Sequence, residues 1–158
     1  MAEKLGIPKR RCPMKSALTS ATVMSLFFLL QACSTTHLSR DEWELKVNDS
    51  ISQWQLESVK KVNTFRLDSW ASLGEKHLIL RTSPSKPYLV ELDARCPQLH
   101  FARALMLDQT MPTSLDAGFD SVFTVQEPHI KCRIKTIYPL NREQDKALLA
   151  LDTQAAED

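Results

Sequence analysis

The feature that most limits what this chain can fold into is an apolar run that follows a basic segment and ends in a cysteine. Four basic residues open the segment, and an uncharged stretch then extends from residue 16 to Cys33. This order is typical of a secretory signal. A membrane-spanning helix needs about 20 mainly apolar residues, and this run is interrupted by five Ser and Thr residues. We therefore predict that residues 1–32 are a signal peptide outside the folded domain.

The last residues of that run, Leu30, Gln31, Ala32 and Cys33, resemble the bacterial lipobox, in which the cysteine receives diacylglycerol. The alternative is an ordinary signal cut elsewhere, which leaves Cys33 as an unmodified thiol. We expect a lipoprotein with palmitate-type lipid on Cys33. The residue after Cys33 is Ser34 rather than Asp, which resembles the pattern for sorting to the outer membrane. We therefore expect the protein to lie on the periplasmic face of the outer membrane.

The predicted leader affects which residue is taken as the start, and it changes the net charge of the chain that remains after cleavage. Met14 followed by Lys15 would by itself open a compact signal, and Cys12 lies before it. Residues 1–32 hold five of the 20 basic and one of the 19 acidic residues, so the remainder carries 15 basic and 18 acidic residues, a net charge of −3. A nucleic-acid partner requires a basic surface, so we expect none. The remaining 126 residues suffice for one domain.

The organisation of that remainder follows from helix-cap and turn signals. We predict a lipidated N-terminus and tether over residues 33–50, a β-rich domain over 51–140, and a C-terminal helix with an acidic tail over 141–158. Ser39, with Glu42 three residues later, predicts a short capped helix, and Asn141 predicts the cap of the last helix.

Short apolar runs between turn residues predict strands within the central domain. The predicted strands cover residues 59–67, 77–82, 88–93, 119–125 and 132–140. Residues 96–108 have apolar side chains at helical spacing, which predicts a short helix or helical turn, and the segment around Trp70 is interpreted as a turn between two strands. The fold class predicted is α+β: a mainly antiparallel sheet or small open barrel with one or two short helices and one disulfide.

Two cysteines remain after Cys33, and they allow two interpretations. Exported proteins meet an oxidising compartment, so Cys96 and Cys132 are expected to form a disulfide. The alternative is a metal-binding or redox protein, since His100 follows Cys96 and His129 precedes Cys132 at spacings that suit zinc or copper.

Motifs for other chemistry are not found in the sequence. Three glycines cannot form a phosphate-binding loop, and neither a nucleophile elbow nor a paired-histidine zinc motif occurs. Asp116 and Asp120, on either side of Gly118, are interpreted as a turn. His37 and His77 are expected to be surface or edge histidines. An enzyme would require groups such as Asp68, His77 and Asp120 to converge.

The tryptophans Trp43, Trp54 and Trp70 lie in the first half of the predicted domain. Core packing is the simpler interpretation for all three. An aromatic contact surface formed by Trp43 and Trp54 is the alternative, with a protein, peptide or glycan as the partner.

Segments such as HLILRT, YLVEL, FDSV and CRIKTIYPL resemble a family of small exported or lipid-anchored proteobacterial proteins that carry one domain of unknown function. The resemblance covers residues 59–140. Its recurring positions correspond here to Trp70, Leu73, His77, Tyr88, Cys96, Leu99, Phe119, Asp120, Cys132 and Ile134. The resemblance includes both cysteines but neither His100 nor His129, so it favours the disulfide, and it implies no activity.

We therefore expect a non-enzymatic, lipid-anchored protein without a cofactor beyond its lipid. Its expected partners are the membrane, through the anchor, and an envelope protein or polymer.

Overall fold

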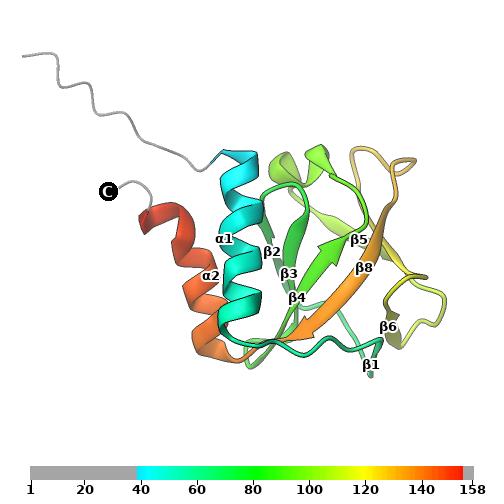
Figure 1. Cartoon of the computed structure of the whole chain (residues 1–158). Coiled ribbons are helices and arrows are strands. Elements are labelled where there is room, and N and C mark those ends of the chain that lie inside the picture. Colours follow the sequence, from blue (N-terminus) through cyan, green and yellow to red (C-terminus); the bar gives the residue numbers. More distant parts are fainter. Residues whose placement is uncertain (1–38, 155–158) are drawn as a thin grey trace, which may run out of the picture. The chain divides into compact units, whose positions relative to one another are not determined.

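The computed structural model describes residues 39–154, and these form two helices and a mostly antiparallel sheet that curls into a half-barrel (Figure 1). The predicted α+β class is confirmed. Within the described residues no helix combines the length and apolar character needed to cross a membrane. In chain order the elements are α1 (Arg40–Gln53), β1 (Lys61–Asn63), β2 (Ser69–Leu73), β3 (His77–Ser83), β4 (Lys86–Leu92), the 3₁₀ helix η1 (Pro97–Phe101), β5 (Leu105–Asp108), β6 (Ser114–Asp116), β7 (Ser121–Thr124), β8 (Cys132–Pro139) and α2 (Arg142–Gln154).

The main sheet has the strand order β2-β3-β4-β8-β7-β5, and β1 pairs separately with β6. β8 bends the sheet because it pairs with different neighbours along its length. Cys132 and Arg133 pair with β7, whereas residues 134–139 pair with β4. The register shifts opposite Lys135, and such a bulge increases local bending and twist. The Gly118 N–H donates to the Ile134 carbonyl at 2.7 Å, which attaches the turn after β6 to β8.

Both helices begin at the caps that the sequence predicts. The Ser39 hydroxyl accepts from the Glu42 N–H, and the Glu42 carboxylate accepts from the Ser39 N–H at 2.8 Å. The Asn141 side chain accepts from the backbone N–H groups of Glu143 and Gln144. These caps satisfy donors that the first helical turn would otherwise leave unpaired. Helix α1 continues to Gln53 and thus crosses the tether boundary predicted at residue 50.

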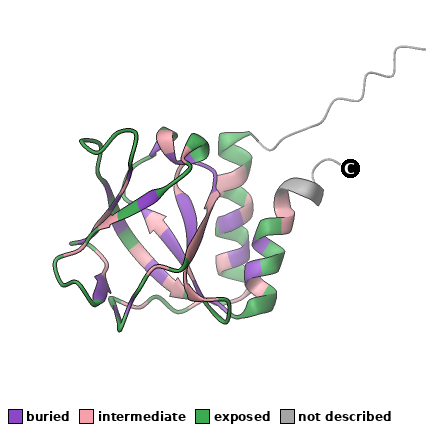
Figure 2. Cartoon of the chain, turned by 180° about the vertical axis from the view of Figure 1, so that it is seen from behind, coloured by how far each residue is buried: buried purple, intermediate pink, exposed green. Residues whose placement is uncertain are grey.

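The two helices lie side by side on one face of the sheet (Figure 1), and buried positions recur along them (Figure 2). The side chains of β3 alternate between the two faces of the sheet. Ile79 faces the helices, whereas Leu78 and Leu80 face the interior of the half-barrel. We call the helix-facing cluster the helix layer. Its buried apolar residues are Val47, Leu73, Ile79, Leu89, Leu140 and Leu148.

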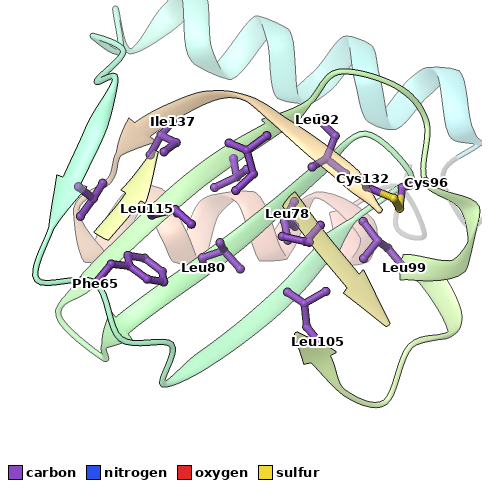
Figure 3. Close-up of a cluster of buried hydrophobic side chains, with 14 residues drawn as sticks. Phe65, Leu78, Leu80, Leu92, Cys96, Leu99, Leu105, Leu115, Cys132 and Ile137 are labelled. Carbon is purple, nitrogen blue, oxygen red and sulfur yellow. A yellow bond between two sulfur atoms is a disulfide. The ribbon is translucent and has the colours of Figure 1, made fainter. Parts of the chain in front are cut away.

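The opposite face of the sheet encloses a larger cluster, the barrel layer (Figure 3). Side chains from the strands converge there with Leu99 of η1 and with the two sulfurs of Cys96 and Cys132. Its buried residues are Val62, Phe65, Leu78, Leu80, Val90, Leu92, Cys96, Leu99, Leu105, Leu115, Val122, Cys132, Ile134 and Ile137. Strands β3 and β4 are therefore covered on both faces, as their continuous apolar runs predict.

One sequence expectation about the elements was wrong, and another was right only in part. Trp70 belongs to strand β2, where it pairs with Leu80, and the turn predicted around it is confined to the residues between Leu73 and His77. The short helix or helical turn predicted over residues 96–108 is confirmed in its first half as the 3₁₀ helix η1, whereas Leu105–Asp108 is strand β5, because it pairs with β7.

Candidate functional site

A disulfide between Cys96 and Cys132 confirms the predicted bond and marks one candidate site. It joins the residue before η1 to the first residue of β8, with the two Cα atoms 6.1 Å apart. Both cysteines are buried, and the Gln98 side-chain amide donates to Cys132 Sγ at 3.2 Å. The bond therefore holds η1 against the start of β8.

A groove of about 530 Å³, the disulfide groove, lies beside this bond. Phe101 and Ile130 line it, and they are 82 % and 49 % exposed although both are large apolar side chains. Single exposed apolar residues are ordinary on protein surfaces, but two that line one groove indicate a contact surface. The remaining lining residues are Arg95, Pro97, Gln98, Ala102, Thr124, Gln126 and Glu127.

A second groove of about 450 Å³, the open seam, follows the edge strand β5. Leu105 and Leu107 of β5 line it from one side and Phe65 and Leu67 from the other, while Met106 is exposed at its rim. The seam lies where the half-barrel does not close. An edge strand beside an apolar groove is a geometry that accepts an added strand.

His77 lies in the helix layer and is 1 % exposed, so the expectation of a surface or edge histidine was wrong. Neither ring nitrogen has a hydrogen-bond partner. Burial lowers the pKa of His77 to about 4, and the nearby carboxylates Glu91 and Glu44 only partly oppose this effect. His77 is therefore neutral at pH 7, and its ring is out of reach of a substrate in this arrangement.

The two carboxylates near His77, Glu44 and Glu91, both belong to ion pairs. Arg95 donates to Asp41 at 2.6 Å and to Glu44 at 3.1 Å, and these hydrogen bonds raise the pKa of Arg95. Lys135 of β8 donates to Glu91 of β4 at 2.7 Å, and this hydrogen bond raises the pKa of Lys135. The cluster is paired in charge, so it offers no isolated catalytic base.

Asp120 is fully buried, and its carboxylate joins two segments of backbone by hydrogen bonds. Its carboxylate accepts from the Thr110 N–H at 2.8 Å and from the Asp116 N–H at 2.7 Å. Gly118, with φ +84°, allows the chain to turn between Asp116 and Asp120. The predicted turn is confirmed. Both oxygens of the Asp120 carboxylate accept from backbone N–H groups, whereas neither ring nitrogen of His77 has a hydrogen-bond partner, so Asp120 and His77 are not bonded to each other.

The other predicted site residues are placed as follows. Cys33 and His37 lie outside the described residues. His100 and His129 are exposed, and over residues 39–154 no group of three or more His, Cys, Asp or Glu side chains is arranged to hold a metal ion. The metal alternative would thus require reduction of the disulfide, and it stays a prediction. Trp43 and Trp54 are half-buried and pack against the helix layer.

Sequence reasoning missed the two grooves. Phe101 and Ile130 are separated by 28 intervening residues, and only the disulfide and the pairing of β7 with β8 bring them to one groove. The sequence signal that could have identified them is their position a few residues after Cys96 and just before Cys132.

Comparison with known proteins identifies the family. No curated protein and no solved structure matches the chain. A family model described as a family of unknown function, DUF6491, matches residues 14–157, and this range includes every described residue. The chain therefore belongs to the family of unknown function DUF6491.

Proposed function

We propose that this protein is a non-enzymatic lipoprotein of the bacterial envelope, anchored by lipid on Cys33 and held on the periplasmic face of the outer membrane. The observation that carries the proposal is the order of a basic segment, an apolar run and the residues Leu30, Gln31, Ala32 and Cys33. The folded domain then serves to bind an envelope protein or polymer near the membrane.

The disulfide supports this location. Bonds between cysteines persist in oxidising compartments and are rare where glutathione and thioredoxin keep thiols reduced. Cys96 and Cys132 are 36 residues apart in the sequence and are both buried in the barrel layer, so their bond is part of the fold. A domain built in this way suits the periplasm.

The surface supports binding. The disulfide groove and the open seam both expose large apolar side chains, Phe101 and Ile130 in the first and Met106 in the second. The chain after residue 32 carries a net charge of −3, which disfavours nucleic acid as the partner.

Metabolic labelling with palmitate tests the anchor. The full chain should incorporate label and fractionate with membranes, and Cys33→Ser should lose the label and keep the uncleaved leader. Cys12→Ser is the matched control, because it removes a cysteine from the leader and should leave labelling unchanged. Recovery of the unlabelled, uncleaved wild-type chain from the cytosol would overturn the proposal.

Intact mass of the purified protein tests the alternative use of the two remaining sulfurs. The proposal requires a mass two hydrogens below that of the dithiol, with no bound metal. Two reduced thiols with stoichiometric zinc or copper would instead favour the metal-binding or redox protein that uses Cys96, His100, His129 and Cys132.

A further inference from the structure

One end of the domain gathers three segments that are distant in the sequence. The start of α1, the 3₁₀ helix η1 and the loop between β7 and β8 all lie at this end, whereas the β1–β6 pair lies at the opposite end (Figure 1). Phe101 connects the three segments. It lines the disulfide groove with Ile130, and it also lines a smaller depression with Arg40 and Trp43 of α1.

The length of chain before α1 limits where this end can lie. Ser39 caps α1 and is six residues after Cys33. Six fully extended residues span at most about 22 Å. A lipid on Cys33 would therefore hold the start of α1 within about 22 Å of the membrane interface, and η1 lies at the same end of the domain.

The chemistry of this end is apolar at its centre and balanced in charge around it. Phe101 is 82 % exposed, and Ile130 across the groove is half-exposed. Arg95 in the groove wall is already paired with Asp41 and Glu44, and Lys131 beside Ile130 is paired with Asp108 at 2.6 Å. Glu127 also lines the groove. This end therefore suits the apolar part of a lipid interface better than it suits a highly anionic surface.

We propose that Phe101 and Ile130 insert into the interface of the leaflet that holds the lipid of Cys33, so that the domain lies on the membrane with the disulfide groove toward it. The inference rests on the proposed lipid anchor. Aromatic and aliphatic side chains at a membrane interface add to an acyl anchor by burying apolar surface. Because the contact is apolar, it holds equally on zwitterionic and on partly anionic lipid.

Photocrosslinking on the full-length lipidated protein tests this orientation. The photoreactive p-benzoylphenylalanine replaces Phe101 in one variant and Asn63 in the control. Asn63 is also exposed, but it belongs to β1, which lies at the opposite end of the domain (Figure 1). Both positions are at the surface, so neither substitution disturbs the core.

Each variant is reconstituted in vesicles of phosphatidylcholine and, separately, of phosphatidylethanolamine with phosphatidylglycerol. We expect lipid adducts several-fold more abundant at position 101 than at position 63, in both kinds of vesicle. Equal adducts at the two positions would overturn the proposed orientation. Crosslinks to protein at position 101 in cells, without lipid adducts, would also overturn it and would identify the groove as a protein-binding surface.

Mass spectrometry of the same samples separates this inference from the proposed function. Lipid on Cys33 with no preference for position 101 would contradict the orientation and leave the anchor intact. Absence of lipid on Cys33 would contradict both.

Discussion

The two faces of the sheet are packed in different ways. The barrel layer is apolar and is closed by a disulfide, whereas the helix layer is smaller and contains ionisable groups, namely His77 and the ion pair of Arg81 with Asp145. This difference indicates that the stability of the two layers depends on different solution conditions. Stability of the barrel layer should depend on redox state, and that of the helix layer on pH and on the contact between α1 and β2.

The largest effect is expected in the barrel layer. Replacing Cys96 and Cys132 together by Ala opens a loop closed across 36 residues, and on the chain-entropy model this lowers the free energy of unfolding by about 3 to 4 kcal/mol. Denaturant unfolding measures the loss. The wild-type protein in reductant should approach the variant, and a difference from oxidised wild type below about 1 kcal/mol would contradict the assignment.

The next effect belongs to the helix layer. Unfolded His77 takes up a proton near its ordinary pKa of about 6.5, but folded His77 does so only near 4. Between these values the unfolded state binds more protons, so stability falls as pH falls from about 6.5 to about 4, by an amount on the order of 3 kcal/mol. Above that window the contribution is constant.

His77→Leu isolates this contribution, because Glu44, Glu91, Lys76 and Lys135 remain in place around the site. The variant should lose less stability than wild type on acidification over the same window, as measured by denaturant unfolding at several pH values. Parallel curves for the two proteins would show that His77 does not carry the pH dependence.

The ion pair that joins α2 to the sheet should have a somewhat smaller effect. Arg81 of β3 donates to Asp145 of α2, with Nε 2.8 Å from the carboxylate, and both side chains are largely buried. Asp145→Asn should cost about 2 to 3 kcal/mol because it leaves a charged guanidinium without its counter-ion.

An exposed pair on the other side of the sheet is the control for this substitution. Asp108 of β5 and Lys131 are each about half exposed, so Asp108→Asn should change the free energy of unfolding by less than about 1 kcal/mol. Equal losses for the two Asp→Asn variants would remove this part of the difference between the layers.

The smallest effect is expected from two glycine substitutions, which separate the cost of backbone strain from the cost of a steric contact with α1. Gly74 and Gly118 have nearly the same φ, +81° and +84°, but an added Cβ at Gly74 would lie 3.1 Å from Trp43 Cβ of α1, whereas at Gly118 nothing lies within 4 Å. Gly118→Ala should cost about 1 kcal/mol and Gly74→Ala distinctly more. Thermal unfolding compares them, and equal costs would show that α1 adjusts without penalty.

Local signals in the sequence predicted the elements in which all residues favour the same secondary structure. The caps at Ser39 and Asn141 and the apolar runs of β3, β4 and β8 are of this kind. Strand β2 was missed because Asp68, Ser69 and Gly74 are turn-forming residues, and its pairing with β3 overrides them. The 3.6-residue spacing of apolar side chains after Cys96 similarly concealed β5.

The candidate grooves were less predictable than the elements. The disulfide followed from the number of cysteines and the expected compartment, but the burial of His77 required knowledge that α1 covers the first residue of β3. The exposure of Phe101 and Ile130 is likewise a property of the folded surface, since an isolated Phe or Ile in a sequence is most often a core residue.

The placement of α1 and α2 has a consequence for how the chain reaches its native state. The first and the last helix of the domain contact each other on the same face of the sheet. When the chain emerges with its N-terminus first, β8 is available before α2, so the half-barrel can assemble while the helix layer still lacks Leu148. Completion therefore waits for the last residues to arrive, and a chain shortened before α2 would expose the part of the apolar sheet face that α2 covers.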